Sequence, residues 1–293
     1  MNLKKVIFFQ RILILTIFFS LFVMSCQSDS NVLVEDIGIC TDFNNASILS
    51  ASGCSYIEES VGRFLIPFKS EEEFDLILKK AKESELSVRA FNCFIPGSLK
   101  SVGPDAVHQE ILEYVEIAFR RAQKAGVNYI VFGSGGSRSV PKGFSRNDAR
   151  QQFIHLCTRM APIAGKYNVV VVLEPLNKKE CNFINSVAEG GEIVKEVNHP
   201  NFMLLADIYH MLMDNESPEN IIKYGDLIKH THIAEKEGRA APGTHNEDFK
   251  PYLEALKKVN YSGMMSIECN WDNLESESVT SIAEIKKQVS MLE

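Results

Sequence analysis

The sequence lacks several features that mark common classes of protein. It has no run of basic residues long enough to follow a phosphate backbone, and its formal net charge is −7, so no nucleic-acid partner is expected. It contains no Cys-x-x-Cys pair and no zinc-ribbon spacing. It contains no long low-complexity linker, which argues against a second domain. Hydrophobic residues make up 45% of the chain, enough for a large core and too many for a disordered protein.

The cysteines are scattered along the chain. Most of those that follow Cys26 lie in apolar surroundings, where a free cysteine behaves as a small hydrophobic residue. A core of this size does not depend on disulfide bonds, so we expect free thiols even in a compartment that permits disulfides. These cysteines are Cys40, Cys54, Cys93, Cys157, Cys181 and Cys269.

The first segment has the composition of a secretory signal. A basic start is followed by the apolar residues 6–24 and then by Ser25 and Cys26. Because a cysteine follows Ser25 directly, the segment resembles a bacterial lipoprotein signal, in which that cysteine is acylated and becomes the new N-terminus. An uncleaved anchor helix is the alternative, although residues 12–24 are short for a span of about 20 residues.

Either interpretation places the rest of the chain outside the cytoplasmic membrane, facing the periplasm or the cell surface. We therefore expect an exported protein that contacts the membrane through a lipid anchor, and we leave open whether it forms a homo-oligomer. The predicted parts are a lipoprotein signal peptide (1–25), the lipidated Cys26 with its tether (26–34) and a single folded domain (35–293).

Short β-rich runs alternate with amphipathic helical runs throughout the folded part. Eight such alternations in about 260 residues favour an α/β fold of the (β/α)₈ TIM-barrel type, in one domain, over an open doubly wound sheet. The predicted strands cover residues 35–40, 55–58, 86–92, 127–132, 169–173, 202–206, 227–233 and 263–267. The clearest predicted helices cover residues 70–81, 105–125 and 146–166, and an acidic first turn after Ser70 suits the first of them.

Four consecutive strands of this pattern end in side chains that can bind a metal. In a β/α barrel the catalytic groups lie at the C-terminal ends of several strands. Three carboxylates that converge there would repel each other, and a divalent cation removes that conflict. Oxygen ligands with one imidazole favour Mn²⁺, with Mg²⁺, Co²⁺ or Zn²⁺ as alternatives. The four residues are Glu174, Asp207, His232 and Glu268.

The segments around these residues resemble a known family. Residues 173–177 (LEPLN), 206–211 (ADIYHM), 230–235 (HTHIAE), 241–245 (APGTH) and 266–268 (SIE) are similar to the xylose isomerase-like TIM-barrel superfamily. The similarity is to its sugar phosphate isomerase/epimerase branch, which includes ketose 3-epimerases, hydroxypyruvate isomerases and inosose dehydratases. The likeness is strong in the C-terminal half and general in the N-terminal half.

The resemblance implies roles for particular residues. Glu174, Asp207, His232 and Glu268 match the metal ligands, and Glu174 and Glu268 also match the pair that exchanges protons with the substrate. Three further residues fall where the family contacts substrate oxygens: Glu180, His210 and Arg239. The arginine lies one residue later after the metal histidine than in the ketose epimerases. The endonuclease members of the superfamily carry extra histidines for a site with several zinc ions. The ends of the second to fourth predicted strands of this chain lack those histidines.

The chemistry expected of such a site is proton transfer next to a carbonyl. One glutamate removes a proton to give an enediolate, and the other returns it, which results in epimerisation or isomerisation of a small carbohydrate. A lyase or dehydratase acting on a keto-sugar or keto-glycoside would use the same four residues. A carbohydrate-binding lipoprotein without catalysis is the third alternative, although a binding protein has no need of the glutamate pair.

Other polar residues near the strand ends have more than one interpretation. His245 follows Pro242-Gly243 in a loop and is a candidate for closing over the substrate. Glu58 either lines the pocket or has only a structural role, and His230 is expected to be a core residue. The segment 133–138 is either an anion cradle or a turn, and it lacks the ending of a nucleotide-binding loop.

Overall fold

The computed structural model describes residues 33–34 and 36–292. The chain divides into two units, residues 1–32 and 33–293, and all of the described residues belong to the second. The predicted signal peptide and the lipidated Cys26 lie outside the described residues. Among the helices of the described part, none has the length and apolar character that a membrane crossing requires.

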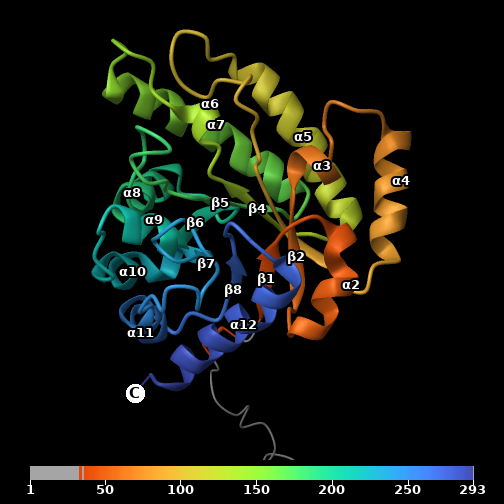
Figure 1. Cartoon of the computed structure of the whole chain (residues 1–293). Coiled ribbons are helices and arrows are strands. Elements are labelled where there is room, and N and C mark those ends of the chain that lie inside the picture. Colours follow the sequence, from red (N-terminus) through yellow and green to blue (C-terminus); the bar gives the residue numbers. More distant parts are fainter. Residues whose placement is uncertain (1–32, 35, 293) are drawn as a thin grey trace, which may run out of the picture. The chain divides into compact units, whose positions relative to one another are not determined.

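Eight parallel strands close into a barrel, with each strand paired to the next along the chain. The last strand pairs with the first through Ile37↔Met265 and Ile39↔Ile267, and this closes the ring. The predicted single-domain TIM barrel is confirmed (Figure 1). The strands are β1 (Ile37–Cys40), β2 (Tyr56–Ser60), β3 (Val88–Asn92), β4 (Tyr129–Phe132), β5 (Val170–Leu173), β6 (Phe202–Asp207), β7 (Ile228–Ile233) and β8 (Met264–Ile267).

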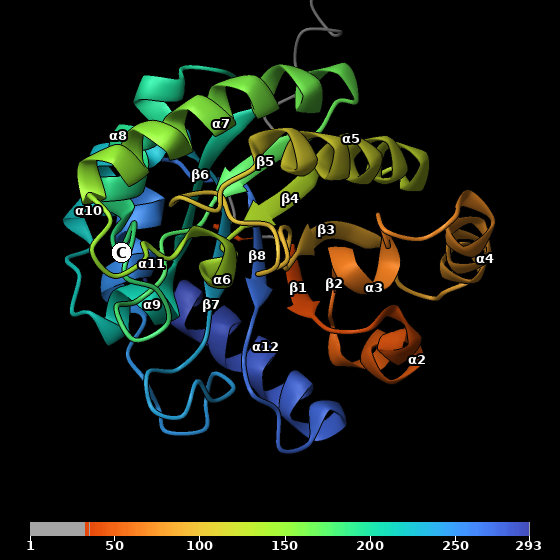
Figure 2. The ribbon, with the colours of Figure 1, turned by 90° about the horizontal axis from the view of Figure 1, so that it is seen from above.

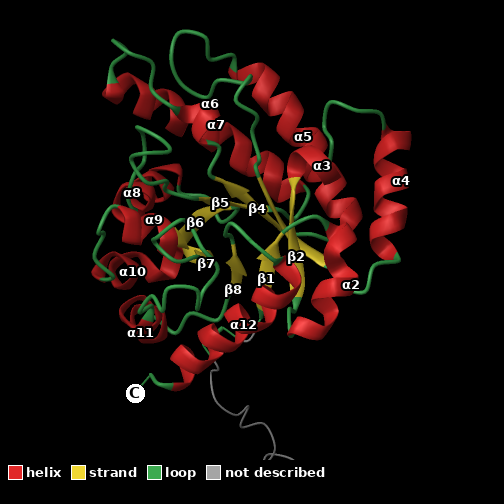
Figure 3. Cartoon of the chain, in the orientation of Figure 1, coloured by secondary structure: helices red, strands yellow, loops and turns green. Residues whose placement is uncertain are grey.

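Helices surround the strands and cover the outside of the barrel (Figures 1 and 3). The view turned by 90° shows α5 and α7 side by side along one flank (Figure 2). The helices are α2 (Ala46–Leu49), α3 (Val61–Phe64), α4 (Glu71–Lys82), α5 (His108–Ala125), α6 (Gly135–Arg138), α7 (Arg146–Lys166), α8 (Val187–Val197), α9 (Ile208–Met213), α10 (Glu219–Tyr224), α11 (Lys250–Lys258) and α12 (Leu274–Ser290). The 3₁₀ helices are η1 (Phe43–Asn45), η2 (Ser50–Ser52) and η3 (Gly225–Leu227).

The long helices begin and end close to the residues that the sequence predicts. Ser70 and Glu73 form a capping box at the start of α4, because each side chain accepts a hydrogen bond from the other residue's backbone N–H. The helix expected over residues 105–125 begins three residues later, at His108, after an irregular segment. The six described cysteines are free, as expected.

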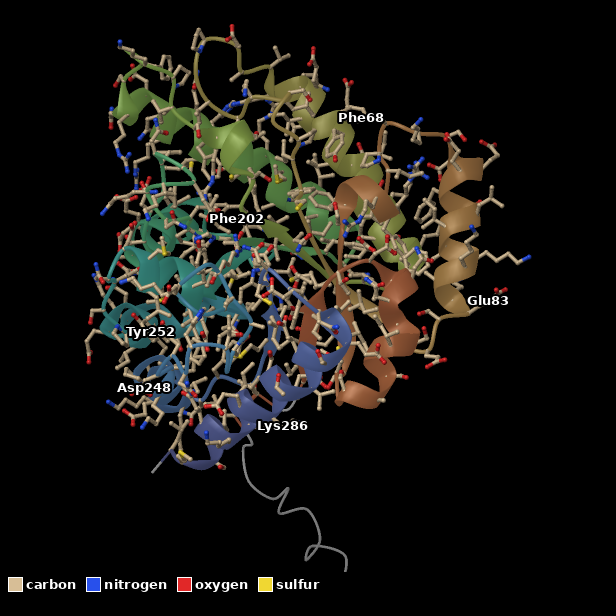
Figure 4. All side chains as sticks on the ribbon, viewed as in Figure 1. Phe68, Glu83, Phe202, Asp248, Tyr252 and Lys286 are labelled. Atoms are coloured by element: carbon tan, nitrogen blue, oxygen red, sulfur yellow. The ribbon has the colours of Figure 1, made fainter. Side chains whose placement is uncertain are left out.

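The main core fills the layer between the barrel and its helices, and Figure 4 labels one of its members, Phe202. Phe132 on β4 contacts Phe94 and Phe153, with ring centroids 5.7 and 5.2 Å apart. Phe202 on β6 is fully buried in the same layer. Alternate residues of a strand point to opposite sides. Phe132 and Phe202 point outward into this layer, so their neighbours along β4 and β6 face the barrel interior.

The barrel interior has two different halves. On β4, β5 and β6 it is apolar, with Val131, Val172 and Leu205 packed together. On β2, β7 and β8 it is polar, although every one of the polar side chains there is fully buried. Branched aliphatic residues ordinarily fill a barrel of this kind, so the polar half is unusual and lies under the end where function is expected. Its members are Tyr56, Glu58, His230, His232 and Ser266.

Candidate active site

The four predicted metal ligands converge at one end of the barrel. Glu174 directly follows β5, Asp207 ends β6, His232 is the penultimate residue of β7 and Glu268 directly follows β8. Each offers a ligand atom, and these four atoms all lie within 4.8 Å of one another. The geometry arises because parallel neighbouring strands end at the same level, so residues at equivalent positions point into the same mouth.

His232 lies at the centre of this cluster. Its Nδ1 is 2.9 Å from Glu174 Oε1 and 3.3 Å from Glu268 Oε2. Its Nε2 points the other way and is 3.0 Å from Glu58 Oε1. The imidazole is fully buried, so its two nitrogen atoms connect the strand ends with the polar interior beneath them.

The carboxyl groups of the site differ in their electrostatic surroundings. Burial raises the pKa of Glu174, and it raises the pKa of Asp207 to about 6. Burial acts in the same direction on Glu268, but the positive charges of His232 and Arg239 outweigh it and lower the pKa to about 2. Several carboxylates thus crowd one largely buried space in which their full ionisation requires additional positive charge.

Unpartnered polar atoms show where such a charge fits. Asp207 Oδ2 and His210 Nε2 are buried without a hydrogen-bond partner, and they lie 3.4 Å from each other. The other oxygen, Asp207 Oδ1, accepts the backbone N–H groups of Tyr209 and His210. A buried carboxylate oxygen without a partner is costly. The donor set of three carboxylates and one imidazole fits a divalent cation, and Asp207 Oδ2 would be one of its ligands.

The backbone around Glu174 is shaped to hold its side chain. A Cβ atom on Gly133 would lie 2.2 Å from Glu174 Oε2, so glycine is required for the observed carboxylate position. Arg138 is fully buried and donates from Nε to the Gly133 carbonyl at 2.6 Å and from NH2 to the Glu174 carbonyl at 2.7 Å. The segment 133–138 is therefore neither an open anion cradle nor a loose turn, because its arginine points inward and joins the ends of β4 and β5.

Three of the four predicted substrate contacts gather beside the metal ligands. Arg239 forms an ion pair with Glu268 through NH2, and its NH1 lies 3.6 Å from Glu180 Oε2. Asn177 connects the other two, since its Nδ2 is 2.9 Å from Glu180 Oε1 and 2.8 Å from His210 Nδ1. The later register of Arg239 therefore does not keep it out of the site. Sequence reasoning assigned no role to Asn177, although it lies in the LEPLN segment.

The fourth predicted contact, His245, lies elsewhere. Its ring Nδ1 is 2.9 Å from Glu235 Oε2, and its side chain is 43% exposed. Glu235 is fully buried and also accepts the backbone N–H groups of Gly243 and His245. This carboxylate therefore organises the loop after β7. A substrate contact by His245 stays a prediction.

Arg239 also lines a cavity. Its volume is about 620 Å³, and Glu180, Tyr209, Arg239 and Asn270 contribute to its lining. The Arg239 guanidinium lies 4.6 Å from the centre of the Tyr209 ring. Glu180 and Arg239 line the cavity and also lie beside the cluster of four ligands, Glu174, Asp207, His232 and Glu268. A substrate in the cavity would therefore reach this ligand cluster past these two side chains.

The chain belongs to the xylose isomerase-like TIM barrel family, whose model matches residues 46–293. It is 32% identical over 148 residues to the L-ribulose 3-epimerase of Methylomonas sp. (strain DH-1), which covers 50% of this chain and 49% of that protein. Other relatives are a ketose 3-epimerase of Arthrobacter globiformis and the putative hydroxypyruvate isomerase of Homo sapiens. The first curated relatives are matched over only about half of their length.

Solved structures agree on the fold. The apo 3-keto-D-glucoside 4-epimerase of E. coli superposes with a TM-score of 0.72 at 19% identity, covering 86% of this chain and 99% of that one. The IOLI protein, whose structure contains a zinc atom, gives a TM-score of 0.68 at 18% identity and covers 87% of this chain and 98% of that one.

Proposed function

We propose that this chain is a divalent-metal-dependent sugar epimerase or isomerase that moves a proton next to a carbonyl group. The observation that carries the proposal is the arrangement of Glu174 and Glu268, whose carboxylates approach the same His232 nitrogen from β5 and β8. The names of the relatives support this class, because they are epimerases and isomerases acting on small sugars or hydroxypyruvate.

Glu174, Asp207, His232 and Glu268 would hold the cation, with Mn²⁺ as the first candidate and Mg²⁺, Co²⁺ or Zn²⁺ as alternatives. When bound, a divalent cation polarises a carbonyl and stabilises the negative charge that develops on its oxygen. Arg239 and His210 lie beside these ligands and would orient substrate oxygens. Arg239 would also place a positive charge near the developing enediolate.

The two glutamates would divide the proton transfer. One carboxylate oxygen removes the proton from the carbon next to the carbonyl, and the enediolate forms. The other glutamate starts in its protonated form and gives its proton to the opposite face of the same carbon, which inverts the configuration. If the proton goes to the neighbouring carbon instead, and a hydroxyl proton moves between the two oxygens, the carbonyl moves. Burial of Glu174 and partial burial of Glu268 limit the access of water to the enediolate during the transfer.

The cavity beside Arg239 supports a substrate that can be larger than one sugar ring. Its volume of about 620 Å³ lies within the usual range for small-molecule sites, and its lining is mixed in charge. A keto-sugar or a keto-glycoside is therefore the proposed substrate class. Loss of an aglycone or of water from the same enediolate remains the runner-up reaction, since the four ligands serve both outcomes.

Exchange of substrate hydrogen with solvent tests this proposal. The protein, supplied with Mn²⁺ in D₂O, is incubated with free ketoses and with 3-keto-glycosides, and the products are followed by NMR. We expect deuterium next to the carbonyl in epimerised or isomerised sugar, and a loss of roughly 10²–10⁴-fold in Glu174→Gln and Glu268→Gln. Glu59→Gln is the control, because Glu59 is also a buried glutamate but pairs with Arg63 on the outer side of β2. Release of an aglycone would favour the lyase, and binding without exchange would favour the non-catalytic alternative.

A further inference from the structure

A buried carboxylate lies directly beneath the ligand cluster. Glu58 on β2 is fully buried inside the barrel, and both of its oxygens accept hydrogen bonds. Oε1 is 3.0 Å from His232 Nε2, and Oε2 is 2.7 Å from His230 Nε2. Ser266 on β8 donates to the same Oε2 at 2.7 Å. Three hydrogen bonds from two neighbouring elements, β7 and β8, thus hold the carboxylate against His232.

The hydrogen bonds continue one layer further down. The Tyr56 hydroxyl lies 2.8 Å from Ser266 Oγ and donates to it, since the Ser266 hydrogen is used towards Glu58. Tyr56 and Glu58 are two residues apart on β2, as His230 and His232 are on β7. Both residues of each pair therefore point into the barrel. Tyr56 and His230 form the layer below Glu58 and His232, and they are connected to Glu58 by hydrogen bonds, Tyr56 through Ser266 and His230 directly.

The two nitrogens of His232 face different partners. Nε2 faces Glu58, which can only accept a hydrogen bond as a carboxylate, so this nitrogen carries a hydrogen. Nδ1 faces the carboxylates of Glu174 and Glu268, which accept its hydrogen while no cation is bound, and it is the nitrogen of this ring that points to the four ligands. A histidine binds a metal through the nitrogen that carries no hydrogen, and the partner of the other nitrogen fixes which one that is.

We propose that Glu58 is the positioning residue of the metal site: it accepts the Nε2–H of His232 and so presents Nδ1, in a fixed ring orientation, to the cation. His230, Ser266 and Tyr56 act through Glu58 by preventing its rotation. The proposal rests on the proposed function only for the presence of a metal ion. It explains why half of the barrel interior is polar, since these residues form one connected set under His232.

The main competitor is a second metal site. Cys40, Glu58 and His232 also offer ligand atoms within 4.8 Å of one another. Both oxygens of Glu58 are already occupied by hydrogen-bond donors, which favours the positioning role. The competitor predicts a second equivalent of metal that depends on Cys40.

Metal binding measured with the metal alone separates these possibilities. Full-length protein, kept in mild detergent because of its apolar N-terminal run, is titrated with Co²⁺ by calorimetry, and its visible absorption spectrum is recorded. For Glu58→Gln we expect affinity weaker by roughly 10–100-fold and an altered Co²⁺ spectrum. Glu59→Gln, the neighbouring buried glutamate on the other face of β2, is expected to keep both affinity and spectrum.

Ser266→Ala provides a second and milder variant in case Glu58→Gln does not fold. It removes one donor to Glu58 and should weaken Co²⁺ binding by a few-fold while the protein stays folded. Unchanged affinity and spectrum in folded Glu58→Gln, or in Ser266→Ala if only that variant folds, would overturn the proposal. An equal loss in Glu59→Gln, or a second equivalent lost in Cys40→Ala, would overturn it as well. If the wild type binds Co²⁺ as expected and no sugar reacts, only the proposed function fails.

Discussion

Gly133 has no side chain, and this determines where the carboxylate of Glu174 can lie. The position has no unusual backbone φ angle, so the need for glycine comes from space alone: a Cβ would lie 2.2 Å from Glu174 Oε2. The carboxylate would have to move away from His232, and a ligand displaced by about 1 Å is costly to function. A residue that looks like part of a flexible turn in the sequence is therefore a determinant of ligand position.

Gly133→Ala is expected to weaken divalent-metal binding by about tenfold or more, with a small effect on the melting temperature. Gly62→Ala is the matched control, because a Cβ there would have Ser60 Oγ as its nearest neighbour, at an ordinary 3.7 Å. Calorimetric titration of both variants with Mn²⁺ measures the effect. Equal affinities would show that Glu174 adapts to the added methyl group.

Glu58 and Glu59 show what the sequence alone does not determine. The two glutamates are adjacent in β2, and a shift of one residue in the strand would exchange their faces. The structure places Glu58 inside the barrel under His232 and Glu59 outside against Arg63. Composition and spacing predict the strand, but the choice between these two side chains depends on its pairing with β1 and β3.

At the scale of elements, the ends of the strands were more predictable than the loops. Each of the eight predicted strands is confirmed within two residues at both of its ends. The four ligands could be found because strand ends of a barrel share one mouth. The roles of Asn177 and Arg138 could not be found, because they depend on contacts between segments that are far apart in the sequence.

An ion-pair cluster ties α4 to α5. Arg121 is 2% exposed, donates to the carbonyls of Leu65 and Lys69, and pairs with Glu71 at 2.7 Å. Arg120 also pairs with Glu71, and the two arginines lower the pKa of Glu71 to about 2. Without Glu71, a buried guanidinium would lose its only carboxylate partner among the described residues.

Glu71→Gln is expected to lower the free energy of unfolding by about 1 kcal/mol at pH 7, a figure reduced because Glu71 is 37% exposed. The pKa in the folded state lies below its ordinary value, so this stabilisation is present above about pH 4.5 and is lost as the pH falls towards 2. Urea denaturation at pH 7 and pH 3 should therefore show a difference from wild type that shrinks at the lower pH. Glu72→Gln, on the same turn, controls for the loss of one surface charge; a difference independent of pH would contradict the assignment.

At the scale of the whole molecule, the interior of the barrel is divided by polarity. The half formed by β4, β5 and β6 packs apolar side chains inside, and the half formed by β2, β7 and β8 carries the buried polar set. Burying polar groups is costly unless they are hydrogen-bonded, and here nearly all of them are. The polar half lies beneath His232, and His232 Nε2 contacts it through Glu58.

The N-terminal segment adds a prediction about location. Residues 1–25 as a signal peptide and Cys26 as a lipid-modified residue remain predictions from the sequence, as does an exported protein held at a membrane. If they hold, the barrel meets its substrate outside the cytoplasm. Free sugars and glycosides fit that location better than sugar phosphates do.

Metal content tests the central claim most directly. The full-length wild type is compared with Glu174→Gln and His232→Ala by mass spectrometry of the purified proteins, before and after incubation with Mn²⁺, Co²⁺ and Zn²⁺. The account predicts about one divalent ion per chain in the wild type and a strong loss in both variants, because each removes a ligand. A folded wild type that stays free of metal after all three ions are offered would contradict it, and the barrel would then be a binding protein rather than a metal-dependent enzyme.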